Sequence, residues 1–206
     1  MKKGINIISK NITWILIAAF LFAVGIAIAT VIPFDMSVLL EETPRSDETF
    51  QQTTDVISKI GELVTQTPVI GAIILFVNNL VAGLVAFIFG LMAGIPTVFS
   101  MLLNGFIVGS VSADLISQGA PVGFILAGLL PHGIPELFAI FICAGLGLKL
   151  GYHVILKPIG GGRRETFGFV WSEMKTVLPL VVVLLFVAAF IEVFATLPIV
   201  EYIFSP

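Results

Sequence analysis

The chain of 206 residues is 58% hydrophobic and only 11% charged, with a net charge of −3 and a mean hydropathy of +1.12. Soluble globular domains carry roughly 25% charged residues, so this composition excludes them and indicates an integral membrane protein. The single cysteine, Cys143, excludes a disulfide framework and a cysteine-built metal site. We expect the lipid bilayer to surround the chain, and we expect no nucleic-acid partner.

Five apolar runs have the length of about 20 residues that a bilayer-crossing helix needs. They are continuously apolar and lack the alternation of a barrel strand, so only helices fit them. The first run is too long for the apolar core of a signal peptide, about 7 to 15 residues, and is predicted to be a retained span. The expected spans of this single membrane domain are residues 12–33, 69–94, 96–115, 134–156 and 177–199.

A sixth apolar stretch, residues 119–130, is too short to cross the bilayer. Residues 119–156 as one straight helix would extend about 57 Å at ~1.5 Å per residue, nearly twice the hydrocarbon thickness. Pro131, Gly133 and Pro135 disfavour helical geometry between the two parts. The sequence therefore predicts an all-α bundle of five spans plus a re-entrant half-helix that breaks at these three residues.

The distribution of charge predicts how the chain crosses the membrane. The N-terminus carries three lysines, and residues 149–175 carry five basic residues against two acids, so both should face the cytoplasm. Residues 35–68 carry seven acids against two bases and should form an extracytoplasmic loop. Within it, residues 46–64 have the period of a short amphipathic helix, which either covers the outer mouth of the bundle or docks an extracytoplasmic partner. Residues 157–175 are expected to be a cytoplasmic loop, and the C-terminus is expected outside.

Glycines recur at intervals of four within the apolar runs. Such pairs allow helix backbones to approach closely in lipid, where no hydrophobic effect drives helices together. They indicate tight packing, and both internal contacts and a homodimer fit the pattern. The pairs are Gly90 with Gly94, Gly105 with Gly109, Gly119 with Gly123, and Gly147 with Gly151.

Six polar side chains lie in or beside the expected spans, where an acid at the bilayer centre costs about 2.5 to 3.5 kcal/mol even on the lenient scale. We expect them to share an interior lined by protein. A structural polar core, a proton or ion pathway and metal-dependent chemistry all remain open for them. Because the spacing lacks the dense ligands of zinc motifs and no nucleophile–base pair occurs, we predict no metal site, no cofactor and no catalytic residues. The six are Asn78, Asn79, Asn104, His132, Glu136 and Glu192.

Several phrases resemble the stage II sporulation protein M family of integral membrane proteins. They are Asn104-Gly105 followed by Gly109, the sequence Leu-Pro-His-Gly-Ile-Pro-Glu-Leu at 130–137, and Ala-Ala-Phe-Ile-Glu at 188–192 with Thr196. The resemblance covers about residues 78–198. In endospore formers the namesake of the family is a scaffold for peptidoglycan-remodelling partners, and members occur far beyond sporulating organisms.

The resemblance implies a membrane scaffold or assembly factor with membrane or extracytoplasmic protein partners. The alternative from the residues themselves is an ion- or proton-coupled transporter or channel that uses His132, Glu136 and Glu192.

Overall fold

The computed structural model describes residues 2–32 and 67–196, and most residues of both ranges are in helices. These two ranges contain no strand, and five of their helices are long and apolar enough to cross a membrane, so the all-α membrane bundle is confirmed. The amphipathic helix expected within residues 35–68 lies outside the described residues. The helices are α1 (Lys2–Lys10), α2 (Ile12–Val31), α5 (Pro68–Ile88), η1 (Phe89–Leu91), α6 (Ile95–Ser117), α7 (Val122–Ile155), α8 (Arg163–Ile191) and η2 (Glu192–Thr196).

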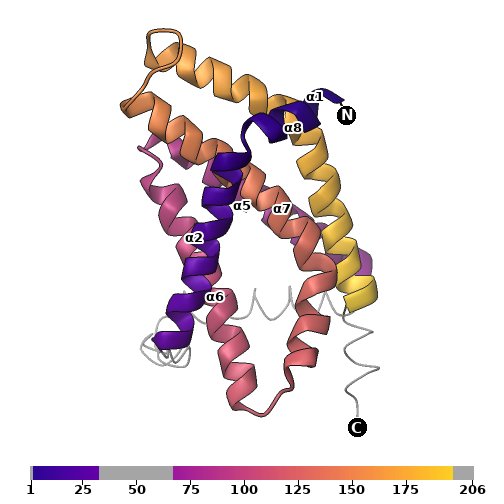
Figure 1. Ribbon diagram of the computed structural model, residues 1–206. Coiled ribbons are helices and arrows are strands. Elements are labelled where there is room, and N and C mark those ends of the chain that lie inside the picture. The colour runs from indigo at the N-terminus through magenta and orange to yellow at the C-terminus, as the bar shows by residue number, and fades with distance from the viewer. Residues whose placement is uncertain (1, 33–66, 197–206) are drawn as a thin grey trace, which may run out of the picture.

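Helix α7 is the centre of the bundle (Figure 1). It packs against α2, α5, α6 and α8, while α2 also packs along α6 and α8 against α5. The short α1 lies across α8 at the end of the bundle where α7 and α8 are joined, and the turn between α6 and α7 lies at the opposite end (Figure 1). The lysine-rich N-terminal segment and the connection between α7 and α8 are therefore at the same end.

The predicted break in α7 is wrong. The helix is continuous from Val122 to Ile155 and contains both Pro131 and Pro135, so no separate half-helix precedes them. Each proline removes only one amide donor, and a bilayer penalises an unwound backbone more than a bend. At ~1.5 Å per residue, 34 residues extend about 51 Å, which exceeds the hydrocarbon thickness of about 30 Å. Figure 1 shows that α7 bends part-way along, which reduces the distance it covers across a membrane.

The last long helix begins earlier than predicted, at Arg163 instead of residue 177. Most of the expected loop at 157–175 is therefore the first part of α8. The hydroxyl of Thr166 accepts a hydrogen bond from the Ile159 amide at 2.8 Å and donates one to the Gly162 carbonyl at 2.9 Å, which ties the connection to this helix. The buried side chains recur every three or four positions, a helical period that the surrounding charges obscured. They are Thr166, Val170, Glu173, Met174 and Val177.

Three of the four glycine pairs lie at contacts between helices of this chain. A Cβ at Gly105 would meet the carbonyl oxygen of Phe22 on α2, and one at Gly90 would meet the carbonyl of Gly147 on α7. Gly119 and Gly123 differ, because a Cβ there would meet nothing within 4 Å. Three of the glycine pairs thus serve packing within this chain. Of the four pairs, only Gly119 with Gly123 remains free for contact with a second chain.

Candidate functional site

The structure brings together three of the six predicted polar residues, His132, Glu136 and Glu192. His132 and Glu136 lie four positions apart on one face of α7, and Glu192 begins η2 at the end of α8. One nitrogen or oxygen atom from each side chain lies within 4.8 Å of the corresponding atoms of the other two. These residues are called the HEE cluster below.

The turn that carries Glu192 also supplies a partner for the histidine. Residues Glu192–Thr196 form a single wide π-helical turn, a feature that often marks functional positions. Within it, the hydroxyl of the buried Thr196 lies 3.2 Å from Nδ1 of His132. This contact orients the imidazole and leaves Nε2 for a further partner.

A cavity of about 360 Å³ opens beside the cluster, between α6, the first half of α7 and η2. It could hold several water molecules or a small solute, since one water occupies about 30 Å³ of liquid. Most of its lining is apolar, and its polar lining consists of His132, Glu192, Thr196 and Ser112. The cavity is therefore mainly apolar, with four polar side chains in its wall.

Among the residues that the structure describes, no basic side chain forms an ion pair with either acid of the cluster. Within residues 2–32 and 67–196, the ion pair that occurs is between Lys149 and Glu173, on a different part of the bundle. Two nearby carboxylates repel each other when both are ionised, and the repulsion grows where water is scarce. A proton or a metal cation shared between Glu136 and Glu192 would relieve it.

Two of the three asparagines, Asn78 and Asn104, are exposed. The side-chain amide of Asn78, which is exposed, donates to Oδ1 of Asn79 at 3.4 Å. Asn104 is also exposed and donates to the carbonyl of Ser100, one turn earlier, at 2.8 Å. Exposed side chains do not share a buried interior, so the expectation of one interior for all six residues does not hold for Asn78 and Asn104.

Sequence reasoning missed a second polar cluster, formed by Asn11, Lys149 and Glu173, which we call the KEN cluster. The Lys149 ammonium donates to Oε2 of Glu173 at 2.6 Å and to Oδ1 of Asn11 at 2.8 Å. Asn11 donates in turn to Oε1 of Glu173 at 3.3 Å. The three side chains are 1%, 8% and 8% exposed, so this network is closed to its surroundings. The available signal was Lys149 itself, a cation inside a run expected to span the bilayer, which needs a partner.

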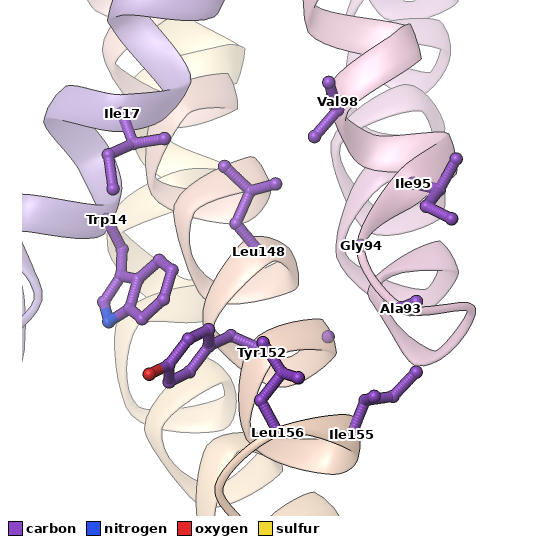
Figure 2. A pocket seen from close by; sticks show the side chains of 11 residues that line it. Trp14, Ile17, Ala93, Gly94, Ile95, Val98, Leu148, Tyr152, Ile155 and Leu156 are labelled. Carbon is purple, nitrogen blue, oxygen red and sulfur yellow. The ribbon is translucent and has the colours of Figure 1, made fainter.

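A second cavity, of about 310 Å³, lies near the same end as the KEN cluster, between α2, the turn before α6 and the end of α7. Figure 2 shows the rings of Trp14 and Tyr152 facing each other beside it, and their centroids lie 5.3 Å apart. Among the described residues that line this cavity, Tyr152 alone is ionisable. We therefore assign this cavity no chemistry.

Comparison with known proteins agrees with the predicted resemblance. The family described as stage II sporulation protein M matches residues 17–197. The chain belongs to this family. An uncharacterized protein of Methanocaldococcus jannaschii is 30% identical over 112 residues, which are 54% of this chain and 63% of that relative. No solved structure matches the chain.

The part of the chain matched to the stage II sporulation protein M family contains the whole HEE cluster and Thr196. It also contains Lys149 and Glu173, whereas Asn11 precedes it. With its five apolar helices, this family member is a multi-pass membrane protein.

Proposed function

We propose that this member of the stage II sporulation protein M family is a membrane scaffold or assembly factor without catalytic activity. The observation that carries the proposal is the central position of α7, which packs against every other long helix, in part through glycine contacts where backbones touch. Alternating access needs two bodies that rock against each other around a site. A bundle built around one shared helix is better suited to holding partners in a constant geometry.

The partners of such a scaffold are proposed to be membrane or extracytoplasmic proteins. We further propose that the N-terminus faces the cytoplasm and the C-terminus the outside. Support comes from the lysine-rich α1, which lies at the same end as the connection that leads to Arg163 and Arg164. Placing both basic segments on the cytoplasmic side satisfies the positive-inside rule.

A second candidate function is ion- or proton-coupled transport. The HEE cluster favours it, because ionisable residues inside a membrane bundle commonly mark ion pathways, and a cavity adjoins this one. Transport would require flux through the cavity, whereas a scaffold requires none.

Two measurements on Glu136→Gln and Glu192→Gln separate these functions. The first is co-purification of a crosslinked, stoichiometric complex from native membranes, and the second is proton flux into liposomes that contain the purified chain. The scaffold role predicts an intact complex in both variants and no flux above protein-free liposomes. Flux in the unaltered chain that both variants lose, without any stoichiometric partner, would contradict it. Asp114→Asn is a matched control, since Asp114 is exposed and bonds only to the neighbouring Gln118 at 2.8 Å among the described side chains.

A further inference from the structure

We propose that His132, Glu136 and Glu192 bind one divalent transition-metal ion of the Zn²⁺ or Mn²⁺ class. One imidazole nitrogen and two carboxylate oxygens form a ligand set that such ions accept readily. This site goes beyond the scaffold role and does not depend on it.

The three side chains are close enough to share one ion after their ligand atoms move together. Metal bonds to these ligands are about 2.0 to 2.2 Å long, so three ligand atoms on one ion lie roughly 3.3 to 3.8 Å from one another. The observed atoms lie within 4.8 Å of one another, so they need to approach by about 1 Å to share one ion, and we assign this movement to the two Glu side chains. The one-turn spacing of His132 and Glu136 directs both toward Glu192 from the same helix.

The charge of the HEE cluster matches a divalent cation. Two ionised carboxylates and a neutral imidazole carry a charge of −2, and no ion pair to either acid occurs among the residues that the structure describes. A dication brings the cluster to neutrality, which matters most where the surroundings are apolar.

The surroundings of His132 also resemble those of a metal ligand. A ligating histidine almost always uses its second ring nitrogen for a hydrogen bond that sets its tautomer and orientation. Thr196 supplies this bond to Nδ1 at 3.2 Å, so Nε2 is the nitrogen assigned to the metal. Thr196 is 3% exposed, so the packing around it holds its hydroxyl in position.

The adjoining cavity provides room for the remaining coordination positions. Three protein ligands leave at least one position for water or another small ligand. Because His132 and Glu192 both line the cavity of about 360 Å³, that position would face open space instead of packed side chains.

The test is titration of the purified full-length chain with Zn²⁺ alone, after treatment with a chelator and using a tag without histidine. We expect saturable binding of about one ion per chain. His132→Gln, Glu136→Gln and Glu192→Gln should each weaken it at least about tenfold, because loss of even an outer-shell partner costs about 10- to 100-fold. His153→Gln, which alters the other histidine of the chain, and Asp114→Asn should bind as the unaltered chain does.

X-ray absorption of the zinc-loaded unaltered chain gives a second readout that needs no variant to fold. The expected spectrum shows nitrogen and oxygen ligands with one imidazole and no sulfur. Absence of saturable binding to the folded chain, binding that survives both His132→Gln and Glu192→Gln, or a sulfur ligand would each overturn the proposal. Partner co-purification is a separate readout, so failure of the metal site and failure of the scaffold role can be told apart.

Discussion

Helix α7 carries members of two polar clusters that solve the problem of charge inside an apolar bundle in opposite ways. In the KEN cluster, Lys149 faces Glu173 at 2.6 Å, and Asn11 completes a closed network of opposite charges. In the HEE cluster, Glu136 and Glu192 are like charges beside an open cavity.

This difference distinguishes polar clusters that stabilise the packing of the helices from polar clusters that can bind a ligand. Charges that neutralise each other and are fully hydrogen-bonded serve to join helices, here the start of α2 with α7 and α8. Charges of one sign that converge without a counter-charge carry a cost to folding, and a bound proton or cation removes that cost. The comparison therefore predicts opposite responses to substitution.

The largest effect is expected for breaking the KEN cluster. Lys149→Met should lower the free energy of unfolding by about 3–5 kcal/mol, because it leaves Glu173 buried without its counter-charge. The double variant Lys149→Met with Glu173→Leu should recover much of that loss. Denaturant titration in detergent micelles measures both, and a double variant as unstable as the sum of the two single variants would contradict the account.

A smaller effect is expected at the glycine contacts. Gly105→Ala should lower the free energy of unfolding by about 1–3 kcal/mol, because its Cβ would press on the Phe22 carbonyl and force α2 and α6 apart. Gly123→Ala is the matched control, with nothing within 4 Å of its Cβ, and should be neutral or stabilising by up to about 1 kcal/mol. The same titration checks the pair, and equal losses would mean that close helix contact is not the cause.

The hydrogen bond to His132 should affect metal affinity more than stability. Thr196→Val keeps the shape of the side chain but removes its hydroxyl, so unfolding should change by only about 1 kcal/mol. Zn²⁺ affinity should fall about 10- to 100-fold, because the imidazole loses the partner that orients it. Calorimetric titration measures the affinity, and an unchanged value would remove Thr196 from the site.

The spans could be predicted because length and hydropathy alone decide whether a helix crosses a bilayer. The start of α8 could not be predicted, because charged residues such as Arg163 and Lys175 are typical of a loop. The buried face of the helix nevertheless continues through this segment. The prediction of a break at Pro131 and Pro135 is wrong. The low helix propensity of proline is outweighed by the need to pair backbone groups within the membrane.

The candidate site was predictable only in part, for a related reason. His132, Glu136 and Glu192 are costly in lipid, so their convergence follows from that cost. Asn104 does not need a partner on another helix, because its side-chain amide donates to the carbonyl of Ser100, one turn earlier in the same helix. The charge of Lys149 predicts a cytoplasmic position for it. Its pairing with Glu173 depends on where α7 and α8 pack against each other, and no local sequence pattern gives that position.

The most direct test of the central claim compares two matched substitutions, Glu192→Gln in the HEE cluster and Glu173→Gln in the KEN cluster, by denaturant titration of the metal-free chain in the same detergent. The account predicts that Glu192→Gln leaves the free energy of unfolding unchanged or raises it, because it removes repulsion from Glu136. Glu173→Gln should lower the free energy of unfolding by about 3–5 kcal/mol, because Lys149 then remains buried without its counter-charge. Comparable losses in both variants would contradict the account, because the HEE cluster would then be part of the architecture.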